Sequence, residues 1–488
     1  MMWQATLGDV IASMKNGIYK PASEYAEDGI PCLRMYNIDA GQLVWRDIKR
    51  MRVSDDELAE FGLREGDLLV NRVNSRELVG KSTCIPASIE PSVFESKNIR
   101  VRLDDGKVLP KFINYQLLAR GSRHFANNAQ QVVGMASISQ KQLASFPIVL
   151  ANLDDQHRIV AEIEKQFSRL DQAVASLRHV KAQLKRYKAS VLKAAVEGRL
   201  VETEAARARR EGRGIETGAE LAAQASANAA RGRKPGAALP YETGEQLLQR
   251  ILDTRRSQWN GKGKYKEPAA PDTAGLPELP EGWAWARLES IAALKGGITV
   301  DSKREDPTAR AVPYLRVANV QRGYLDLSEV KTINAPDLDI EELRLQRGDI
   351  LFNEGGDRDK LGRGWIWEGQ LPNCIHQNHV FRARLVSPDI LPKLVSWWGN
   401  SFGKDYFQRE GKQTTNLASI NLTKLRGFPV PLPPLSEQHR IVAEVDRRLS
   451  IVREVEAEVD ANLKRAQTLR QAVLTRAFFS GPVAQEAV

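Results

Sequence analysis

The sequence predicts a mixed α+β protein made of two copies of one unit, in which a globular domain is followed by a long helix. Three observations support this fold class: a peptide that occurs twice, further matches at the same offset upstream of it, and a helical spacing of apolar residues downstream. The peptide QHRIVAE stands at 156–162 and again at 438–444, an offset of 282 residues. Seven identical residues at two places in one chain indicate an internal duplication.

The same offset holds without a gap through most of the upstream sequence. The matching pairs include Leu33 and Leu315, Asn37 and Asn319, Asp67 and Asp349, Asn71 and Asn353, Gly80 and Gly362, Pro110 and Pro392, and Phe146 and Phe428. Near the N-terminus the register slips by one or two residues. We therefore interpret the chain as a tandem repeat.

This repeat predicts the domain organisation. We expect a first globular domain at 1–152, a first helix at 153–199, a linker at 200–280 with a docked helix near 243–259, a second globular domain at 281–434, a second helix at 435–481 and a tail at 482–488. Short apolar or alternating runs in both globular domains predict strands, and glycines and prolines between them predict turns. The alanine-, glycine- and arginine-rich middle of the linker predicts a flexible segment.

Apolar residues recur in steps of three and four along both predicted helices, which is the spacing of a coiled coil. The spacing begins with Ile163, Phe167, Leu170 and Val174 in the first helix, and with Ile441, Val445, Leu449 and Val452 in the second. The expected helix ends are Asp154 or Asp155 and Ser436 as N-caps and Gly198 as a stop. Each helix would be roughly 65 Å long. The simplest arrangement packs the two helices on each other, and the alternative packs each on its own globular domain.

Composition narrows the class of protein. A chain of 488 residues with 42% hydrophobic residues indicates two or more globular domains. The net charge of +10 suggests a polyanionic partner. Cys32, Cys84 and Cys374 form no C-x-x-C pair, which argues against a disulfide framework or a thiolate metal site and fits the cytosol. No secretory signal and no apolar run of membrane-spanning length is present, so we expect a cytoplasmic protein.

The sequence contains no recognisable catalytic or metal-binding motif. The one Pro-Pro pair, Pro433-Pro434, is followed by leucine rather than the aromatic residue of an amino-methyltransferase, and the Gly-Lys pairs lack the frame of a P-loop. His376 and His379 beside Cys374 lack a fourth zinc ligand. We therefore expect no catalytic residue, no metal and no cofactor in this chain.

Side chains that suit DNA gather in loops at matching places of the two copies. Asn, Gln and Arg can read base edges, and Lys, Ser and Thr can bind phosphates. The candidates in the first copy are Asn71, Arg72, Asn74, Arg76, Lys81, Gln130, Gln131, Ser137, Gln140 and Lys141. Those in the second are Asn353, Arg358, Lys360, Arg363, Lys412, Gln413, Thr414, Thr415, Asn416, Asn421 and Lys424. The loops occupy matching places but differ in their side chains, which predicts two surfaces that read different sequences. Ordinary solvated loops are the alternative.

Two stretches resemble the specificity subunits of type I restriction-modification systems. PLPPLSEQHRIVAEVD is similar to the start of that family's conserved helix, and LLQRILDTRRSQW with KYKEPAAPDTAGLPELPEGWAWARL is similar to its central region. The resemblance covers essentially the whole chain. The first copy departs from it, because ANLDDQHRIVAEIE replaces the Pro-Pro-Leu lead and the chain starts almost at Trp3.

The resemblance implies a DNA-recognition subunit without chemistry of its own. Its two target-recognition domains would bind the two halves of an asymmetric, interrupted DNA target, and its two helices would form an antiparallel coiled coil that sets the gap. Two methylation subunits with S-adenosylmethionine and two restriction subunits with ATP and Mg would supply the activities. A coiled-coil scaffold with protein-binding globular ends is the rival interpretation.

The repeated heptapeptide predicts two docking sites for the methylation subunit. The expected docking residues are Gln156, His157, Arg158, Gln438, His439 and Arg440. An intrahelical ion pair between Arg158 and Glu162 is an alternative reason for the recurrence of those two residues, but it leaves the preceding Gln-His pair unexplained.

Overall fold

The computed structural model describes residues 2–132, 134–213, 241–259, 263–299, 309–356, 361–413 and 418–479. It divides into two compact units, here called unit 1 (Met1–Lys181 with Ala457–Val488) and unit 2 (Ala182–Glu456). Helix α5 (Leu153–Val196) and helix α14 (Leu435–Phe479) each supply residues to both units. The middle of the linker, for which the sequence predicts flexibility, lies outside the described residues.

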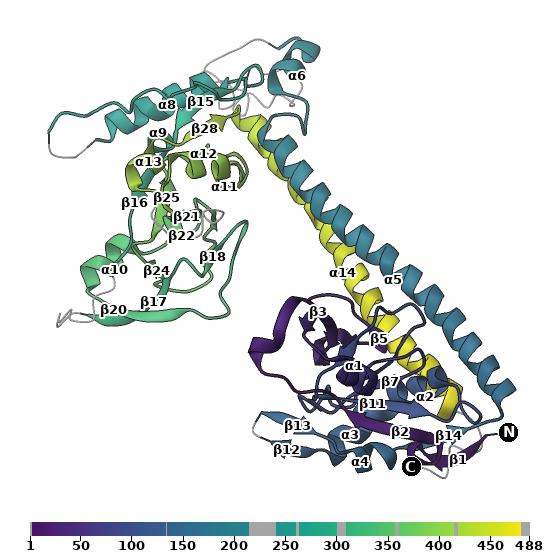
Figure 1. The fold of residues 1–488 in the computed structure, drawn as a ribbon. Coiled ribbons are helices and arrows are strands. Elements are labelled where there is room, and N and C mark those ends of the chain that lie inside the picture. Colours follow the sequence, from purple (N-terminus) through teal and green to yellow (C-terminus); the bar gives the residue numbers. More distant parts are fainter. Residues whose placement is uncertain are drawn as a thin grey trace. The chain divides into compact units, whose positions relative to one another are not determined.

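Unit 1 is a mixed domain whose centre is a four-stranded antiparallel sheet (Figure 1). Its order is β2 (Ile11–Asn16), β11 (Asn98–Leu103), β7 (Leu68–Asn71) and β9 (Ser82–Cys84). A second sheet has the order β10 (Val93–Phe94), β3 (Tyr25–Leu33) and β6 (Lys49–Met51), with β10 parallel to β3. A third has the order β12 (Gln130–Val132), β13 (Met135–Ser137) and β8 (Val73–Asn74). The remaining pairs are β1 (Trp3–Thr6) with β14 (Pro147–Leu150) and β4 (Ile38–Asp39) with β5 (Gln42–Leu43).

Short helices cover the sheets of unit 1. They are η1 (Leu7–Val10), η2 (Ala22–Glu24), η3 (Met35–Asn37), α1 (Asp55–Phe61), α2 (Pro110–Gln116), the π-helical turn η4 (Leu117–Gly121), α3 (Ser122–Asn128) and α4 (Gln140–Ala144). Local sequence sets their starts. Ser54 and Glu57 form a capping box at α1, and Pro110 stands in the first turn of α2 where no backbone donor is needed.

Unit 2 has sheets of the same strand order, and its strands follow at nearly the same offset. The four-stranded sheet is β16 (Ala292–Lys295), β25 (Val380–Leu385), β21 (Ile350–Asn353) and β23 (Gly364–Ile366). The sheet with a parallel pair is β20 (Lys331–Ala335), β17 (Arg310–Leu315) and β24 (Ile375–His376). The others are β22 (Gly355–Gly356), β27 (Ala418–Ser419) and β26 (Lys412–Gln413); β15 (Ala284–Arg287) with β28 (Pro429–Leu432); and β18 (Val320–Gln321) with β19 (Tyr324–Leu325).

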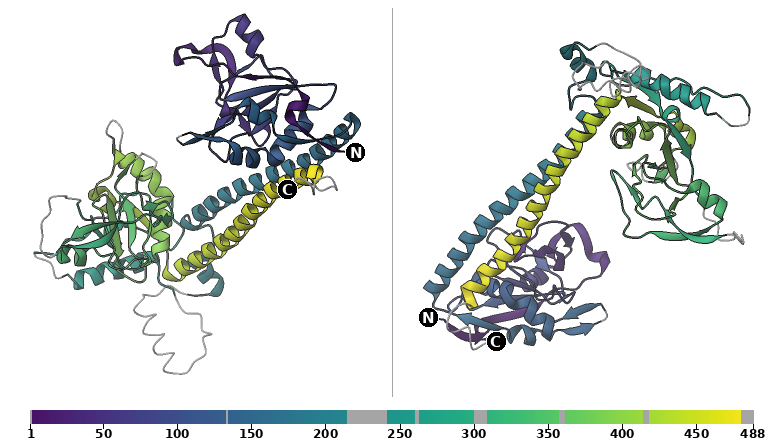
Figure 2. Two further views of the ribbon diagram at one scale, coloured as in Figure 1. Left: turned by 90° about the horizontal axis from the view of Figure 1, so that it is seen from below. Right: turned by 180° about the vertical axis from the view of Figure 1, so that it is seen from behind.

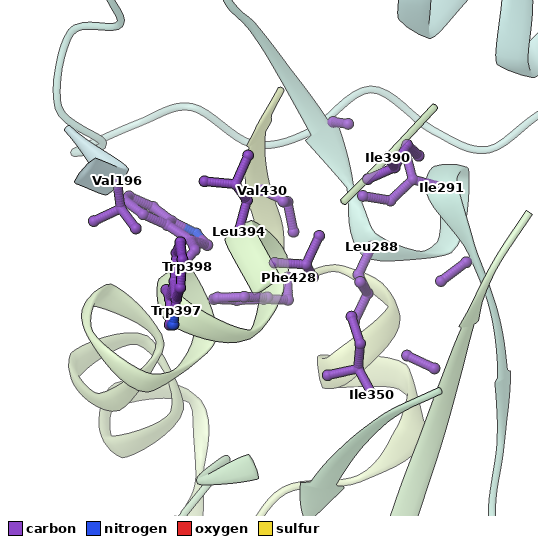
Figure 3. Close-up of a cluster of buried hydrophobic side chains, with 14 of the residues drawn as sticks. Val196, Leu288, Ile291, Ile350, Ile390, Leu394, Trp397, Trp398, Phe428 and Val430 are labelled. Atoms are coloured by element: carbon purple, nitrogen blue, oxygen red, sulfur yellow. The ribbon is translucent and has the colours of Figure 1, made fainter. Parts of the chain in front are cut away.

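The short helices of unit 2 pack on several buried clusters. The helices are α6 (Glu204–Glu211), α8 (Gly244–Ser257), α9 (Leu288–Ile291), α10 (Asp337–Leu343), α11 (Pro392–Asn400), α12 (Phe402–Glu410) and α13 (Leu422–Arg426). Of these, α8, α9, α11, α12 and α13 contribute to a core rich in aromatic residues. In Figure 3, Trp397 and Trp398 of α11 lie beside Val196, and Phe428 lies between α11 and Leu288 of α9. Leu247 and Ile251 bury one face of α8 against this core, whereas Trp259, two residues beyond its end, is 48% exposed.

Two buried details recur in both units and explain why the sequence matches at those places. Arg102 pairs with the buried Asp67 at 3.0 Å, and Arg384 pairs with the buried Asp349 at 2.8 Å. Gly80 has φ +82°, and a Cβ there would lie 2.1 Å from the ring of Phe125. Gly362 has φ +62° and the same relation to Phe407, at 1.9 Å. Only glycine combines this conformation with this approach.

Within each unit the two long helices run antiparallel side by side (Figures 1 and 2). In unit 1, Lys181 pairs with Asp460 at 2.6 Å and Asp171 with Arg470 at 2.7 Å. In unit 2, Lys188 pairs with Glu456 at 2.6 Å. The helices also pack on the globular parts, because Ile163, Phe167, Leu474 and Phe478 belong to the core of unit 1, and Ile441 and Val445 to that of unit 2.

The expected N-caps are wrong and the expected stop of the first helix is right. Helix α5 begins at Leu153, and Asn152 caps it by accepting the Asp155 N–H at 2.8 Å, so the aspartates lie in the first turn. Helix α14 begins at Leu435, which places Ser436 in its first turn. Gly198, with φ +67°, ends α5, and the next N–H reaches back to the Ala194 carbonyl at 2.8 Å. Among the described residues no helix has the length and apolar content to cross a membrane.

Candidate nucleic-acid interface

The candidate interface of unit 1 starts where β7 leaves the central sheet. Asn71 is fully buried there and donates to the Lys97 carbonyl at 3.2 Å and to Asn98 Oδ1 at 3.0 Å. Its own Oδ1 accepts from Asn74 Nδ2 at 2.7 Å, and Asn74 is 5% exposed. Asn71 and Asn74 therefore make their hydrogen bonds inside the domain, and their contact with DNA stays a prediction. Their amides hold the β7–β8 connection against β11, and the buried carboxamides are already satisfied.

The matching asparagine of unit 2 is also buried but has different hydrogen-bond partners. Asn353 is fully buried, and its Nδ2 donates to the carbonyls of Val317 at 3.2 Å and Val320 at 2.9 Å. The Oδ1 of Asn353 is buried without a hydrogen-bond partner among the described residues, and contact of Asn353 with DNA stays a prediction. A short polar side chain at the end of a central strand binds the adjacent loop rather than solvent.

Several candidates of unit 1 lie at the surface around this connection. Arg72 is half-buried, and its Nε is buried without a hydrogen-bond partner among the described residues. Arg76 is exposed and donates to the Ala126 carbonyl at 3.1 Å. Lys81 is half-buried, and burial lowers the pKa of its ammonium while the charge of Asp39 opposes that shift. These are cations at the rim of one loop cluster.

The hairpin β12–β13 and helix α4 supply the remaining candidates of unit 1. Gln130 is exposed and its backbone pairs with Ser137, which is half-buried. Gln140 Nε2 donates to Asn16 Oδ1 at 3.1 Å, and Lys141 is exposed. The side chain of Gln131 lies outside the described part.

In unit 2 the structure describes only some of the candidates. Arg363 is half-buried and donates to the Val317 carbonyl at 3.3 Å. Asn421 caps α13 by accepting the Lys424 N–H at 2.9 Å, and Lys424 pairs with Glu410 at 2.5 Å. Arg358, Lys360, Thr414, Thr415 and Asn416 lie outside the described residues, as do the side chains of Lys412 and Gln413, whose backbone forms β26.

Lys97, Glu354 and His379 belong to the same two edges, and the sequence interpretation missed them. Lys97 is exposed, and its carbonyl accepts the Arg72 N–H at 2.8 Å. In unit 2, Glu354 Oε2 lies 2.5 Å from His379 Nδ1, and the Glu354 N–H donates to the His379 carbonyl at 2.9 Å. The repeat offset contained the signal, because it aligns Arg72 with Glu354 and Lys97 with His379.

Unit 1 also has exposed aromatic side chains. Tyr19 is 82% exposed and Tyr36 is 65% exposed. The Arg34 guanidinium lies 5.4 Å from the centre of the Tyr36 ring. Aromatic rings and guanidinium groups together suit contact with nucleic acid, through stacking and phosphate binding.

Cys374, His376 and His379 do not form a metal site. His376 is fully buried, its Nδ1 lies 2.6 Å from the Val380 carbonyl, and burial lowers its pKa to about 4. Burial also raises the pKa of the Cys374 thiol to about 12, so the thiolate that metals prefer is disfavoured. Among the described residues, no three His, Cys, Asp or Glu side chains are grouped as ligands.

The glutamine of each QHRIVAE copy braces its own unit. Gln156 is fully buried, its Oε1 accepts the Leu109 N–H at 2.9 Å, and its Nε2 donates to the carbonyls of Lys107 and Ala151. Gln438 is also fully buried. Its Oε1 accepts the Leu391 N–H at 2.9 Å, and its Nε2 donates to the carbonyls of Asp389 and Pro433. The side chains of Gln156 and Gln438 therefore make their hydrogen bonds inside the domain, and their role as docking residues stays a prediction.

The other docking candidates differ between the two copies. His157 and Arg158 are exposed, and Arg158 pairs with Asp155 rather than with Glu162. His439 is exposed, but Arg440 is half-buried and pairs with Glu204 of α6. The ion pair between positions 158 and 162 that the sequence suggested is therefore wrong.

A small buried hydrogen-bond network connects α6 with the second QHRIVAE copy at the start of α14. The Glu204 N–H donates to Glu437 Oε2 at 2.8 Å, and Trp283 Nε1 donates to Glu437 Oε1 at 2.9 Å. Burial raises the pKa of Glu437. Burial also opposes ionisation of Glu204, but hydrogen bonds from Arg213 and Arg440 outweigh it and keep the pKa of Glu204 below its usual value.

No protein-family model matches the chain. Curated relatives do: the chain is 22% identical to the type I restriction enzyme EcoBI specificity subunit of Escherichia coli, over 98% of this chain and 85% of that protein. It is 26% identical to the EcoKI specificity subunit of Escherichia coli K12, over 39% of this chain and 41% of that protein. A solved structure described by the complex assembly and conformational transition of the type I R-M system contains a chain with TM-score 0.57 and 16% identity, covering 98% of this chain and 97% of that one. This last likeness shows the fold.

Proposed function

We propose that this chain, a homologue of the type I restriction enzyme specificity subunits over nearly its whole length, is the non-catalytic DNA-recognition subunit of a type I restriction-modification complex. The observation that carries the proposal is a duplicated scaffold with two different polar edges. The buried pairs Asp67–Arg102 and Asp349–Arg384 recur, whereas the surface loops beside them differ.

The two globular parts are two copies of one target-recognition domain, and each binds half of an asymmetric DNA target. Equal strand orders and braces at the same offset support the duplication. In unit 1 the candidate contacts are Arg72, Arg76, Lys81, Gln130, Gln131, Ser137, Gln140 and Lys141. In unit 2 they are Arg358, Lys360, Arg363, Lys412, Gln413, Thr414, Thr415, Asn416, Asn421 and Lys424. Phosphate contacts give affinity and base contacts give sequence choice.

The two long helices form an antiparallel coiled coil that sets the gap between the half-sites. Cross-helix ion pairs within each unit support this role, as does the apolar seam. Helices of 44 and 45 residues are each roughly 65 Å long, about two turns of DNA.

The names of the relatives support assembly with other subunits of a type I restriction enzyme, and the copy numbers and cofactors are part of the proposal. Two methylation subunits with S-adenosylmethionine and two restriction subunits with ATP and Mg would carry out the chemistry that this chain directs. His157 and Arg158 in one copy, and His439 and Arg440 in the other, are the proposed docking residues for the methylation subunits.

Reconstitution tests the proposal. The purified chain alone should show no methylation, ATPase or cleavage, and with its methylation subunit it should methylate one interrupted DNA motif. DNA affinity should fall steeply with salt, because bound phosphates release counterions. DNA binding that does not respond to salt, or assembly with proteins only, would favour the coiled-coil scaffold instead.

A further inference from the structure

One position of each unit combines a fixed backbone with opposite side-chain chemistry. In unit 1, the Arg72 N–H donates to the Lys97 carbonyl at 2.8 Å, and the Arg72 carbonyl accepts the Ile138 N–H at 2.9 Å. In unit 2, Glu354 makes the same two bonds, to the His379 carbonyl at 2.9 Å and from the Ile420 N–H at 2.8 Å. Both residues follow the last residue of the central strand and are 282 positions apart. Two backbone hydrogen bonds, one from the N–H and one to the carbonyl, therefore fix the Cα from which each side chain starts.

The fold itself does not require a particular charge at this position. Where the scaffold needs a charged side chain, both units keep it, as at Asp67 and Asp349. At positions 72 and 354 the same backbone carries an arginine in one unit and a glutamate in the other. A rigid surface position whose chemistry reverses is suited to recognition, where two different ligands must be told apart.

The arginine is prepared to bind an acceptor. Its Nε is buried and has no hydrogen-bond partner among the described residues, and no carboxylate of the described part forms an ion pair with it. The two terminal nitrogens of its guanidinium carry the donors that can form paired hydrogen bonds to an acceptor. Lys97 next to it is exposed and adds a second positive charge.

The glutamate is prepared to accept from a donor. An ionised carboxylate only accepts hydrogen bonds, so the His379 Nδ1 that lies 2.5 Å from Glu354 Oε2 carries a proton and donates it. This bond orients the carboxylate, whose side chain is 27% exposed, and within the described residues Oε1 receives no hydrogen bond. The carboxylate is therefore held by one hydrogen bond from the described residues, and its side chain remains partly exposed.

We propose that Arg72 and Glu354 are corresponding base-specifying residues of the two half-sites, with Arg72 reading guanine and Glu354, oriented by His379, reading cytosine. Guanine offers two acceptors, O6 and N7, to a guanidinium, and cytosine offers the N4 amino group to a carboxylate. Lys97 supports Arg72 by binding a neighbouring phosphate or acceptor, and His379 is a positioning residue. This proposal rests on the proposed function and adds which residue reads which kind of base.

The test maps methylated adenines across genomic DNA after the full chain is assembled with its methylation subunit. Glu354→Gln should lower discrimination at one position of one half-site by about tenfold, which corresponds to about 1.4 kcal/mol. Arg72→Gln should do the same at one position of the other half-site. The unaltered half-site in each variant shows that the chain folds and assembles, and Glu368→Gln, at an exposed loop of unit 2, is the matched control.

An exchange variant gives a result that a structural role would not produce. Glu354→Arg combined with His379→Lys should change the preferred base at that position from cytosine to guanine, and Glu354→Asp should keep cytosine. An unchanged motif in Glu354→Gln and in the exchange variant overturns the proposal, as does relaxation of both half-sites together. If Glu354→Gln abolishes methylation, the base preferred by Glu354→Asp and by the exchange variant at that position decides whether the proposal holds. If the wild-type complex methylates no interrupted motif, the proposed function itself fails. The wild-type experiment therefore separates this outcome from failure of the base assignment alone.

Discussion

Gln156 joins the first turn of α5 to the start of α2, because its Oε1 accepts the Leu109 N–H at 2.9 Å while its side chain is fully buried. Replacement by alanine should leave this N–H and two carbonyls without partners. We expect Gln156→Ala to lower the free energy of unfolding by about 1–3 kcal/mol, and Gln438→Ala to have a similar effect. Thermal or denaturant unfolding measures it. Gln172→Ala, on the exposed face of the same helix, is the control, and an equal loss there would contradict the bracing role.

His376 should make unit 2 sensitive to acid. Its folded pKa of about 4 is below the usual histidine value, because burial disfavours the charged ring. The unfolded chain therefore binds more protons between about pH 6.5 and 4, and stability should fall as pH decreases through that window. Phe94 stands at the matching position of unit 1, with the same strand pairing. We expect His376→Phe to flatten this dependence in denaturant unfolding followed against pH. His157→Phe, at an exposed position, should leave it as in the wild type.

The two docking sites should respond unequally to substitution. His157→Ala with Arg158→Ala should reduce the bound methylation subunits from two copies toward one without lowering the melting temperature, because both side chains are exposed. His439→Ala with Arg440→Ala should remove the other copy and also destabilise unit 2 by about 1–3 kcal/mol, because the buried Glu204 loses one of its two arginine partners. Native mass measurement and thermal unfolding read the two effects.

Arg169→Ala, on the exposed face of α5, is the control for this experiment. Retention of two partner copies after replacement of both pairs would place docking elsewhere.

Lengthening both long helices together should lengthen the DNA gap. One extra heptad after His179 in α5 and one after Asn462 in α14 keep the apolar seam in register and add about 10 Å. We expect the methylated motif to keep its half-site bases and to gain about three base pairs between them, at ~3.4 Å per base pair. A heptad in α5 alone, which breaks the cross-helix ion pairs, is the control and should impair assembly. Changed half-site bases at an unchanged gap would show that the helices do not set the gap.

Much of the architecture could be predicted from the sequence, because duplication and helical periodicity can be recognised from the spacing of residues alone. The offset of 282 residues aligns strands that the structure pairs in the same order, and the apolar steps of three and four fall on α5 and α14. The sequence has no catalytic motif, and the start of its second long helix resembles that of the specificity subunits. Together these features predict a specificity subunit, and the relatives support this prediction. These features are local or periodic, so they do not depend on knowing which strands are neighbours.

Only the tertiary structure decided which polar residues face outward. Asn71 and Gln156 looked like surface residues by type, but Asn71 meets Asn98 on the next strand and Gln156 meets Leu109, and both are buried. Arg440 is covered by α6, whereas its counterpart Arg158 is not. Burial of a polar side chain depends on a partner far away in the sequence that satisfies its hydrogen bonds, and this partner exists only once the chain is folded.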